Sequence, residues 1–117
     1  MDDLVSTQWL ADNLKAADIV VLDASWHMPN AGRDARTEYE QRHIPGARFF
    51  DLDFLSDHDA ATPHMLPAAT NFGQGMEALG VGSGDRIVVY DQSPLRTSAR
   101  AWFMLRHFGA TQVSILD

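Results

Sequence analysis

Three short runs of aliphatic residues constrain the fold of this chain more than any other feature of its sequence. They cover residues 19–23 (IVVLD), 86–90 (RIVVY) and 112–116 (QVSIL), and a further apolar run covers residues 47–52. Continuous runs of this kind, rich in β-branched residues, are typical of strands buried on both faces of a parallel sheet. Because segments with helical character separate the runs, the sequence predicts an α/β fold in which helices flank both faces of the sheet.

Four helices are expected between these strands, over residues 6–14, the second half of 33–42, 71–79 and 93–108. Three of them begin at a serine or an asparagine, whose side chains accept hydrogen bonds from the free N–H groups of a first helical turn. Gly109 follows the last helix, and glycine commonly ends helices. The long segment 54–70 contains two prolines and no clear element, and loops of this length in small domains are often functional.

The length of 117 residues fits one domain spanning residues 1–117. A hydrophobic fraction of 45% and a charged fraction of 21% are ordinary for a globular protein. An α/β domain normally continues from a strand into a covering helix, whereas this sequence stops at Asp117, directly after a strand. We therefore expect a domain that is truncated at its C-terminal end.

The charge and hydropathy of the chain argue against several classes of partner. A net charge of −7 without a basic patch disfavours binding to nucleic acid. No apolar run approaches the roughly 20 residues that span a membrane, and the acidic N-terminus lacks the apolar core of a signal peptide. A cytoplasmic protein without a nucleic-acid or membrane partner is therefore expected.

The chain contains no cysteine, which excludes disulfides, thiolate metal sites and thiol nucleophiles within it. Asp57, His58 and Asp59 lie near His64, but their spacing matches no strong metal-binding motif. Neither a metal nor a cofactor is therefore expected.

Polar groups that could move protons are concentrated between residues 43 and 67. This stretch begins with a rigid turn at Ile44-Pro45-Gly46, and then carries acids and histidines through a loop to His64. A loop histidine is more often a surface residue or a structural hydrogen-bond partner than a catalytic group, so the residues alone leave its role open.

A polar segment and several large aromatic residues are further candidates for contact with a ligand or partner. Arg33 and Arg36 lie in the segment 33–42, whose alternating charges are typical of a solvated face. Each arginine either meets an anion or a partner domain, or lies on exposed surface. Trp26 and the Phe49-Phe50 pair are expected in the core or at an interface, since large aromatic side chains dominate both.

The loop after strand 86–90 is the natural ligand-binding position of such a sheet. Its residues are Asp91, Gln92, Ser93, Pro94, Leu95 and Arg96. A strand, a tight loop and a helix N-terminus together form a cradle of backbone N–H groups that favours an anion. Asp91 either satisfies these N–H groups itself or acts as a general base or anion gate.

In this loop the chain resembles the rhodanese-homology family. Active members carry Cys-x-x-Gly-x-Arg-Ser between the strand and the helix, and Arg96 and Thr97 stand at the Arg-Ser positions here. Asp91 replaces the sulfur-carrying cysteine, and Pro94 replaces the glycine. The resemblance therefore implies a rhodanese-like fold whose own loop is degenerate and cannot form a persulfide.

Nearly the whole chain is similar to the N-terminal, non-catalytic domain of the 3-mercaptopyruvate and thiosulfate sulfurtransferases. The motifs that carry the similarity are LDASW (22–26), GRDAR (32–36), HIPGA (43–47), FFDLD (49–53), HMLP (64–67) and VSILD (113–117). HIPGA alone would indicate only a rhodanese-type domain, whereas the combination indicates this subfamily.

That resemblance implies a two-domain enzyme whose second domain holds the cysteine, with the active site between the domains. The first domain lends this site an aspartate and a histidine, which correspond by motif to Asp53 and His64. The expected reaction moves a sulfane sulfur from 3-mercaptopyruvate or thiosulfate to a thiol or cyanide acceptor through a cysteine persulfide. The expected partners are a C-terminal catalytic rhodanese domain, a small-molecule sulfur donor and a thiol acceptor, and this chain alone is expected to be inactive.

Two alternatives remain. An inactive rhodanese-type module could use the Asp91 loop or the segment 24–42 to bind or regulate a partner. A phosphatase built on the same fold is disfavoured, because its chemistry also needs the cysteine.

Overall fold

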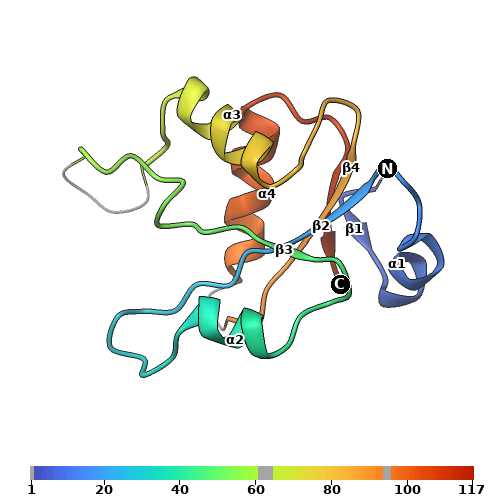
Figure 1. Cartoon of the computed structure of the whole chain (residues 1–117), viewed down its shortest axis with the longest axis horizontal. Coiled ribbons are helices and arrows are strands. Elements are labelled where there is room, and N and C mark those ends of the chain that lie inside the picture. Colours follow the sequence, from blue (N-terminus) through green and yellow to red (C-terminus); the bar gives the residue numbers. More distant parts are fainter. Residues whose placement is uncertain (1, 61–64, 94–95) are drawn as a thin grey trace.

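The structure, a computed structural model, describes residues 2–60, 65–93 and 96–117. In this part of the chain, five parallel strands form one sheet in the order β1-β5-β4-β2-β3 (Figure 1). The strands are β1 (Leu4–Val5), β2 (Ile19–Asp23), β3 (Arg48–Phe49), β4 (Arg86–Tyr90) and β5 (Val113–Leu116). The helices are α1 (Thr7–Asn13), α2 (Ala35–Gln41), α3 (Ala69–Ala78) and α4 (Thr97–His107).

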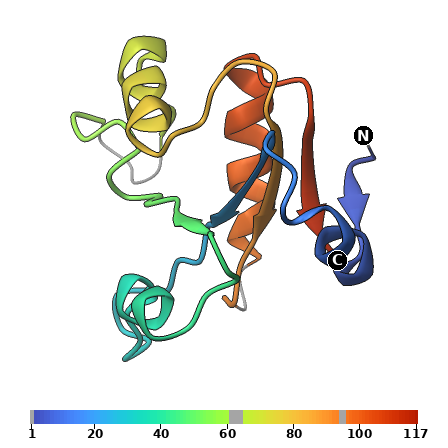
Figure 2. The ribbon, with the colours of Figure 1, turned by 45° about the vertical axis from the view of Figure 1, so that its right-hand side comes forward.

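Helices cover both faces of the sheet, which confirms the predicted α/β class. Along β4, Ile87 and Val89 face α3 and α4, while Val88 and Tyr90 face α1, because successive side chains of a strand point to opposite faces. Figure 2 shows α1 apart from the α3–α4 layer, and places α2 away from both, at the end of the sheet.

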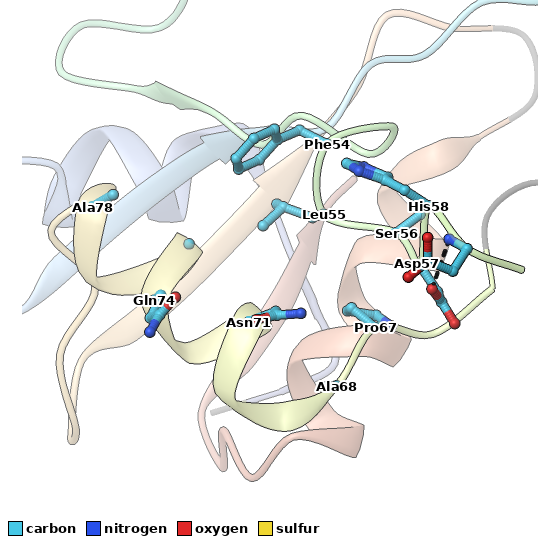
Figure 3. A pocket seen from close by; sticks show the side chains of 12 residues that line it. Phe54, Leu55, Ser56, Asp57, His58, Pro67, Ala68, Asn71, Gln74 and Ala78 are labelled. Atoms are coloured by element: carbon cyan, nitrogen blue, oxygen red, sulfur yellow. Dashed lines mark hydrogen bonds between the residues drawn. The ribbon is translucent and has the colours of Figure 1, made fainter.

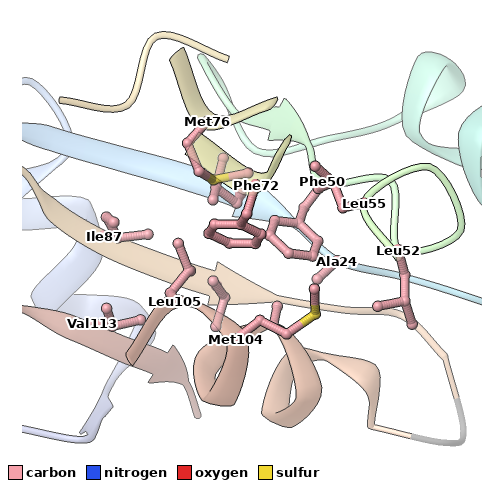
Figure 4. Close-up of a cluster of buried hydrophobic side chains, with 13 residues drawn as sticks. Ala24, Phe50, Leu52, Leu55, Phe72, Met76, Ile87, Met104, Leu105 and Val113 are labelled. Carbon is pink, nitrogen blue, oxygen red and sulfur yellow. The ribbon is translucent and has the colours of Figure 1, made fainter. Parts of the chain in front are cut away.

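The larger core lies between the sheet and the α3–α4 layer (Figure 4). Phe72 and Met76 of α3 meet Met104 and Leu105 of α4 there, and Phe50 is completely buried among them. Apolar side chains of this size contribute roughly 1.5–3 kcal/mol each when fully buried. The packing of α3 and α4 therefore holds the chain segment after β3 in place, and that segment contains residues 51–60, which we call the acidic loop.

The two central strands, β2 and β4, have the bounds that the sequence predicts, whereas the edge of the sheet differs. The expected strand 47–52 pairs with β2 only at Arg48 and Phe49. Phe50 and Leu52 are nevertheless buried, so the apolar run reflects burial rather than further strand pairing. The short β1 was not predicted, because two residues are too few to show a pattern.

The helix starts depend on capping. Ser6 caps α1 as predicted, since its hydroxyl accepts a hydrogen bond from the N–H of Trp9 at 3.0 Å. The helix expected from Asn71 begins two residues earlier, at Ala69, without a side-chain cap. The helix expected from Ser93 begins only at Thr97, because Asp91 rather than Ser93 bonds the first turn, through the N–H of Ser98.

Among the described residues, no helix combines the length and the apolar character that crossing a membrane requires. The expectation that the domain is truncated at its C-terminal end stays a prediction.

Candidate functional site

The carboxyl ends of β2, β3 and β4 meet at one edge of the sheet. Asp23, the last residue of β2, pairs with Tyr90 on one side and with Phe49 on the other. The loops that leave this edge carry most of the site residues predicted from the sequence (Figure 1). Ligands of open α/β sheets bind outside these strand ends, so this edge is the candidate site.

A hollow of about 240 Å³ lies at this edge and brings three predicted site residues together. Arg33, Arg36 and Asp53 all line it, although the first and last are far apart in the sequence. Its wall also includes Trp26 and Phe49. Asp34 and Asp51 also line it, so the hollow brings two arginines and three aspartates together. The presence of Arg33, Arg36 and Asp53 in one hollow supports the hypothesis that these residues serve one site.

The carboxylate of Asp53 is bound by the indole of Trp26. The indole N–H lies 3.0 Å from one carboxylate oxygen and 3.1 Å from the other. Asp53 is exposed on a turn after β3, whereas the Trp26 ring is half-buried against the core. The sequence predicts Trp26 in the core or at an interface but does not reveal this contact, because no local pattern connects residues separated by 27 positions.

His64, the predicted catalytic histidine, lies outside the described residues, so its role stays a prediction. The chain that follows returns to the acidic loop, since the carbonyl of Met65 accepts a hydrogen bond from the N–H of Asp57 at 2.9 Å.

Arg33 is held by Glu38 of α2. Its Nε and Nη2 groups donate to the two carboxylate oxygens at 2.9 and 3.0 Å. Glu38 also contacts Nε2 of His27 at 3.0 Å, and the His27 side chain is only 2% exposed. The hydrogen bond from Arg33 is the main reason that the pKa of Glu38 is lowered, and it outweighs the opposite effect of burial.

Arg36 is held more loosely. Its Nη2 group lies 3.4 Å from the carboxylate of Asp51, and its guanidinium lies 4.7 Å from the centre of the Phe49 ring. The side chain is 56% exposed. Arg36 is therefore better placed than Arg33 to bind an anion that enters the hollow.

In the loop after β4, the carboxylate of Asp91 accepts hydrogen bonds from the loop itself and from the first turn of α4. One oxygen of Asp91 accepts hydrogen bonds from the N–H and hydroxyl of Ser93 at 3.0 and 3.1 Å, and the other accepts one from the N–H of Ser98 at 2.7 Å. These contacts agree with the structural interpretation of Asp91, in which it satisfies the helix N-terminus itself. The N–H of Gln92 donates to the Ser25 hydroxyl at 2.8 Å and thereby joins this loop to the loop after β2.

Three further residues of this loop were predicted to belong to the site. Pro94 and Leu95 lie outside the described residues. Arg96 is exposed and has a φ of 53°, in the left-handed region that non-glycine residues seldom adopt.

A second, larger hollow of about 700 Å³ lies between the acidic loop and α3 (Figure 3). Phe54 stands at its rim, 68% exposed and edge-on to the ring of His58. Nε2 of His58 lies 3.0 Å from the carbonyl oxygen of Asp53. In the part of the chain that is described, no group of three or more His, Cys, Asp or Glu side chains is arranged to hold a metal ion.

The parallel sheet with helices on both faces and a strand–loop–helix cradle at its carboxyl edge defines an α/β domain of the rhodanese type. The family model of the rhodanese-like domain matches residues 6–117. The chain therefore belongs to the rhodanese-like domain family, as its motifs indicated.

Individual members of the family show which of its proteins this chain is similar to. The chain is 50% identical to the 3-mercaptopyruvate sulfurtransferase of Mus musculus, in an alignment that covers 97% of this chain and 40% of the relative. It is 46% identical to the mitochondrial thiosulfate/3-mercaptopyruvate sulfurtransferase 1 of Arabidopsis thaliana, covering 99% of this chain and 31% of the relative. The chain thus spans less than half the length of the curated relatives that it matches.

The fold has a solved counterpart. The crystal structure of SseA from Escherichia coli, described as a 3-mercaptopyruvate sulfotransferase of rhodanese fold, superposes with a TM-score of 0.92 at 42% identity. The match covers 99% of this chain and 45% of that structure. Because the relatives include a mitochondrial protein, the cytoplasmic location stays a prediction.

Proposed function

We propose that this chain forms the N-terminal, non-catalytic domain of a two-domain sulfurtransferase. The full protein would move a sulfane sulfur from 3-mercaptopyruvate or thiosulfate to a thiol or cyanide acceptor. The observation that carries the proposal is the grouping of Asp53, Arg33 and Arg36 in one hollow, beside a loop whose cysteine position is filled by Asp91. The names of the relatives and their greater length support it.

The chemistry requires a nucleophile that this chain lacks. A cysteine thiolate of the second domain would attack the sulfur of 3-mercaptopyruvate, and the C–S bond would break with its electron pair left on carbon. The resulting enolate of pyruvate takes up a proton, and the cysteine becomes a persulfide. With thiosulfate, the S–S bond breaks instead and sulfite leaves with the electron pair.

The residues of this chain would handle the proton and the charge. His64, oriented by Asp53, would transfer the proton, with base and nucleophile supplied by different domains. The exposed guanidinium of Arg36 would face the anionic donor, whereas the outer edge of Arg33, whose guanidinium is paired with Glu38, would face the second domain. Aspartate at position 91 would keep the loop after β4 closed to a second anion.

The proposal is tested by assaying sulfur transfer from 3-mercaptopyruvate to a thiol in the product of the complete reading frame and in this chain alone. We expect activity only in the complete protein, because only there is a cysteine available. His64→Ala should lower its kcat by about 100-fold, a typical contribution of general acid–base catalysis. His107→Ala at the end of α4 is the matched control and should change kcat little.

Two results would count against the proposal. Unchanged turnover in the His64→Ala protein would remove the assignment of the histidine. A complete reading frame without a second, cysteine-bearing domain would favour the inactive binding module instead.

A further inference from the structure

We propose that Trp26 is a positioning residue for Asp53, and that a cluster of the buried His27 with Glu38 and Arg33 holds Trp26 in place. The inference rests on the proposed function, in which Asp53 orients the catalytic histidine. It assigns a role to the indole N–H that neither the motifs nor the family comparison provides.

The geometry of the contact fixes the direction of the carboxylate. The final torsion of an aspartate side chain has broad, weakly separated minima, so an exposed carboxylate on a turn rotates easily. The single N–H of Trp26 is shared almost equally by the two oxygens of Asp53, at 3.0 and 3.1 Å. Rotation of the carboxylate about its last bond would lengthen at least one of these contacts, so the indole restricts the group to one plane.

Trp26 can do this because its neighbours on both sides in the chain, Ser25 and His27, are anchored by hydrogen bonds. On one side, the Ser25 hydroxyl accepts a hydrogen bond from the N–H of Gln92, and the N–H of Ser25 donates to Asp23 at 2.9 Å. On the other side, the buried His27 contacts Glu38 of α2 at 3.0 Å. The residue that presents the indole therefore lies between the sheet edge and α2.

Arg33 completes the anchor on the α2 side. Its guanidinium donates two hydrogen bonds to the carboxylate of Glu38, at 2.9 and 3.0 Å. A forked pair of this kind fixes the carboxylate more firmly than a single contact does. Arg33 therefore influences the site through Glu38 and His27. Arg36, whose ion pair with Asp51 is longer at 3.4 Å, is better able to bind an anion.

The contact itself can be tested in this chain by NMR of the indole N–H groups. Asp53→Asn removes the charge that the Trp26 indole N–H meets, so we expect the Trp26 resonance to shift upfield. The indole of Trp102 donates to the carbonyl of Val113 at 3.1 Å and should not move, which makes it an internal control. A Trp26 resonance that stays in place in Asp53→Asn would overturn the proposal.

The functional consequence is tested in the complete enzyme with Trp26→Phe, which removes the N–H and retains an aromatic ring. We expect kcat to fall about 10- to 100-fold, as the loss of a hydrogen bond to a charged group implies, and KM to change little. Combining Trp26→Phe with Asp53→Ala should cost no more than Asp53→Ala alone, because the two residues act as a unit. Trp102→Phe deletes the same group elsewhere and should leave kcat unchanged.

The anchor is tested with Arg33→Gln and Glu38→Gln. Each should lower kcat while leaving KM for 3-mercaptopyruvate unchanged, and the double variant should be no worse than either single one. Arg36→Gln should instead raise KM. A raised KM with normal kcat in Arg33→Gln would show that Arg33 binds the donor directly, and would overturn this part of the inference.

The two levels of failure are distinguishable. If the complete protein transfers no sulfur, the proposed function fails, while the indole resonance still decides whether Trp26 holds Asp53. If wild-type kcat persists in Trp26→Phe but Asp53→Asn is inactive, the function stands and the positioning role fails.

Discussion

At the scale of single residues, Asp91 shows how a carboxylate in a loop can satisfy the N-terminus of the helix that follows. Its carboxylate accepts hydrogen bonds from the N–H groups of Ser93 and Ser98, so these two groups are already satisfied. The identity of the residue could be read from the sequence, and so could the tendency of an acid to occupy a helix N-terminus. Which N–H groups it meets depends on the path of the loop, which begins α4 four residues later than Ser93 suggested.

Tyr90 provides a test at the same scale. Burial is the main reason that the pKa of its phenol rises from an ordinary 10.0 to about 12. Its hydroxyl oxygen accepts a hydrogen bond from the N–H of Ile44 at 3.2 Å. Because the unfolded chain releases this proton at lower pH than the folded protein, the stabilisation is complete below pH 10 and is lost as pH rises towards 12.

The free energy of unfolding should therefore decrease between pH 10 and 12. The chain has two tyrosines, so a near-ultraviolet absorbance titration of the Tyr39→Phe variant reports Tyr90 alone. Titration of the same variant in denaturant is the control. A folded protein whose Tyr90 titrates as the unfolded chain does would contradict the buried position.

At the scale of elements, α3 contains two glycines in different surroundings. A Cβ at Gly73 would meet nothing within 4 Å, whereas a Cβ at Gly75 would lie 2.4 Å from the side chain of Leu55. Leu55 is buried and belongs to the core beneath the acidic loop. The close approach of α3 to this loop therefore depends on Gly75 and not on Gly73.

Gly73→Ala should raise the free energy of unfolding by about 0.5–1 kcal/mol, because alanine loses less backbone freedom in a helix than glycine does. Gly75→Ala should gain nothing or destabilise the protein, because Leu55 must move. Urea denaturation of the two variants compares their free energies of unfolding. Equal stabilisation of both would show that Leu55 moves aside without a loss of stability.

The strands also show how far a local sequence pattern predicts the bounds of an element. The strands β2 and β4 were predicted with the bounds observed, since each is flanked by other strands and buried on both faces. The strand predicted over residues 47–52 is reduced to Arg48–Phe49 at the edge of the sheet, where it has a neighbouring strand on one side only. An apolar run predicts burial reliably, but its pairing depends on which strand lies beside it.

At the scale of the whole molecule, the hollow that contains Asp53 opens at the edge of the sheet, where the proposed second domain would lie. Interfaces between domains of one chain commonly bury about 600–1,500 Å². The backbone N–H groups at the rim of the hollow, near Trp26, Arg36 and Asp53, should then be shielded in the complete protein.

Hydrogen–deuterium exchange of the complete protein and of this chain alone measures this directly. We expect slower exchange around residues 25–36 and 51–58 in the complete protein, and no change in α1, which packs on the opposite face of the sheet from α3 and α4. If residues 25–36 and 51–58 exchanged at the same rate in the two samples, the second domain would have to lie elsewhere.

The sequence by itself determined the fold class, the central strands, the cap of α1 and the family, because each depends on residues that are close in the chain or on whole motifs. It also singled out Asp53, Arg33 and Arg36 as residues of interest. Only the tertiary structure placed these three in one hollow and joined Asp53 to the indole of Trp26. Such contacts depend on how the packed elements position side chains that are distant in the chain. A local sequence pattern does not show which of these side chains lie close together in space.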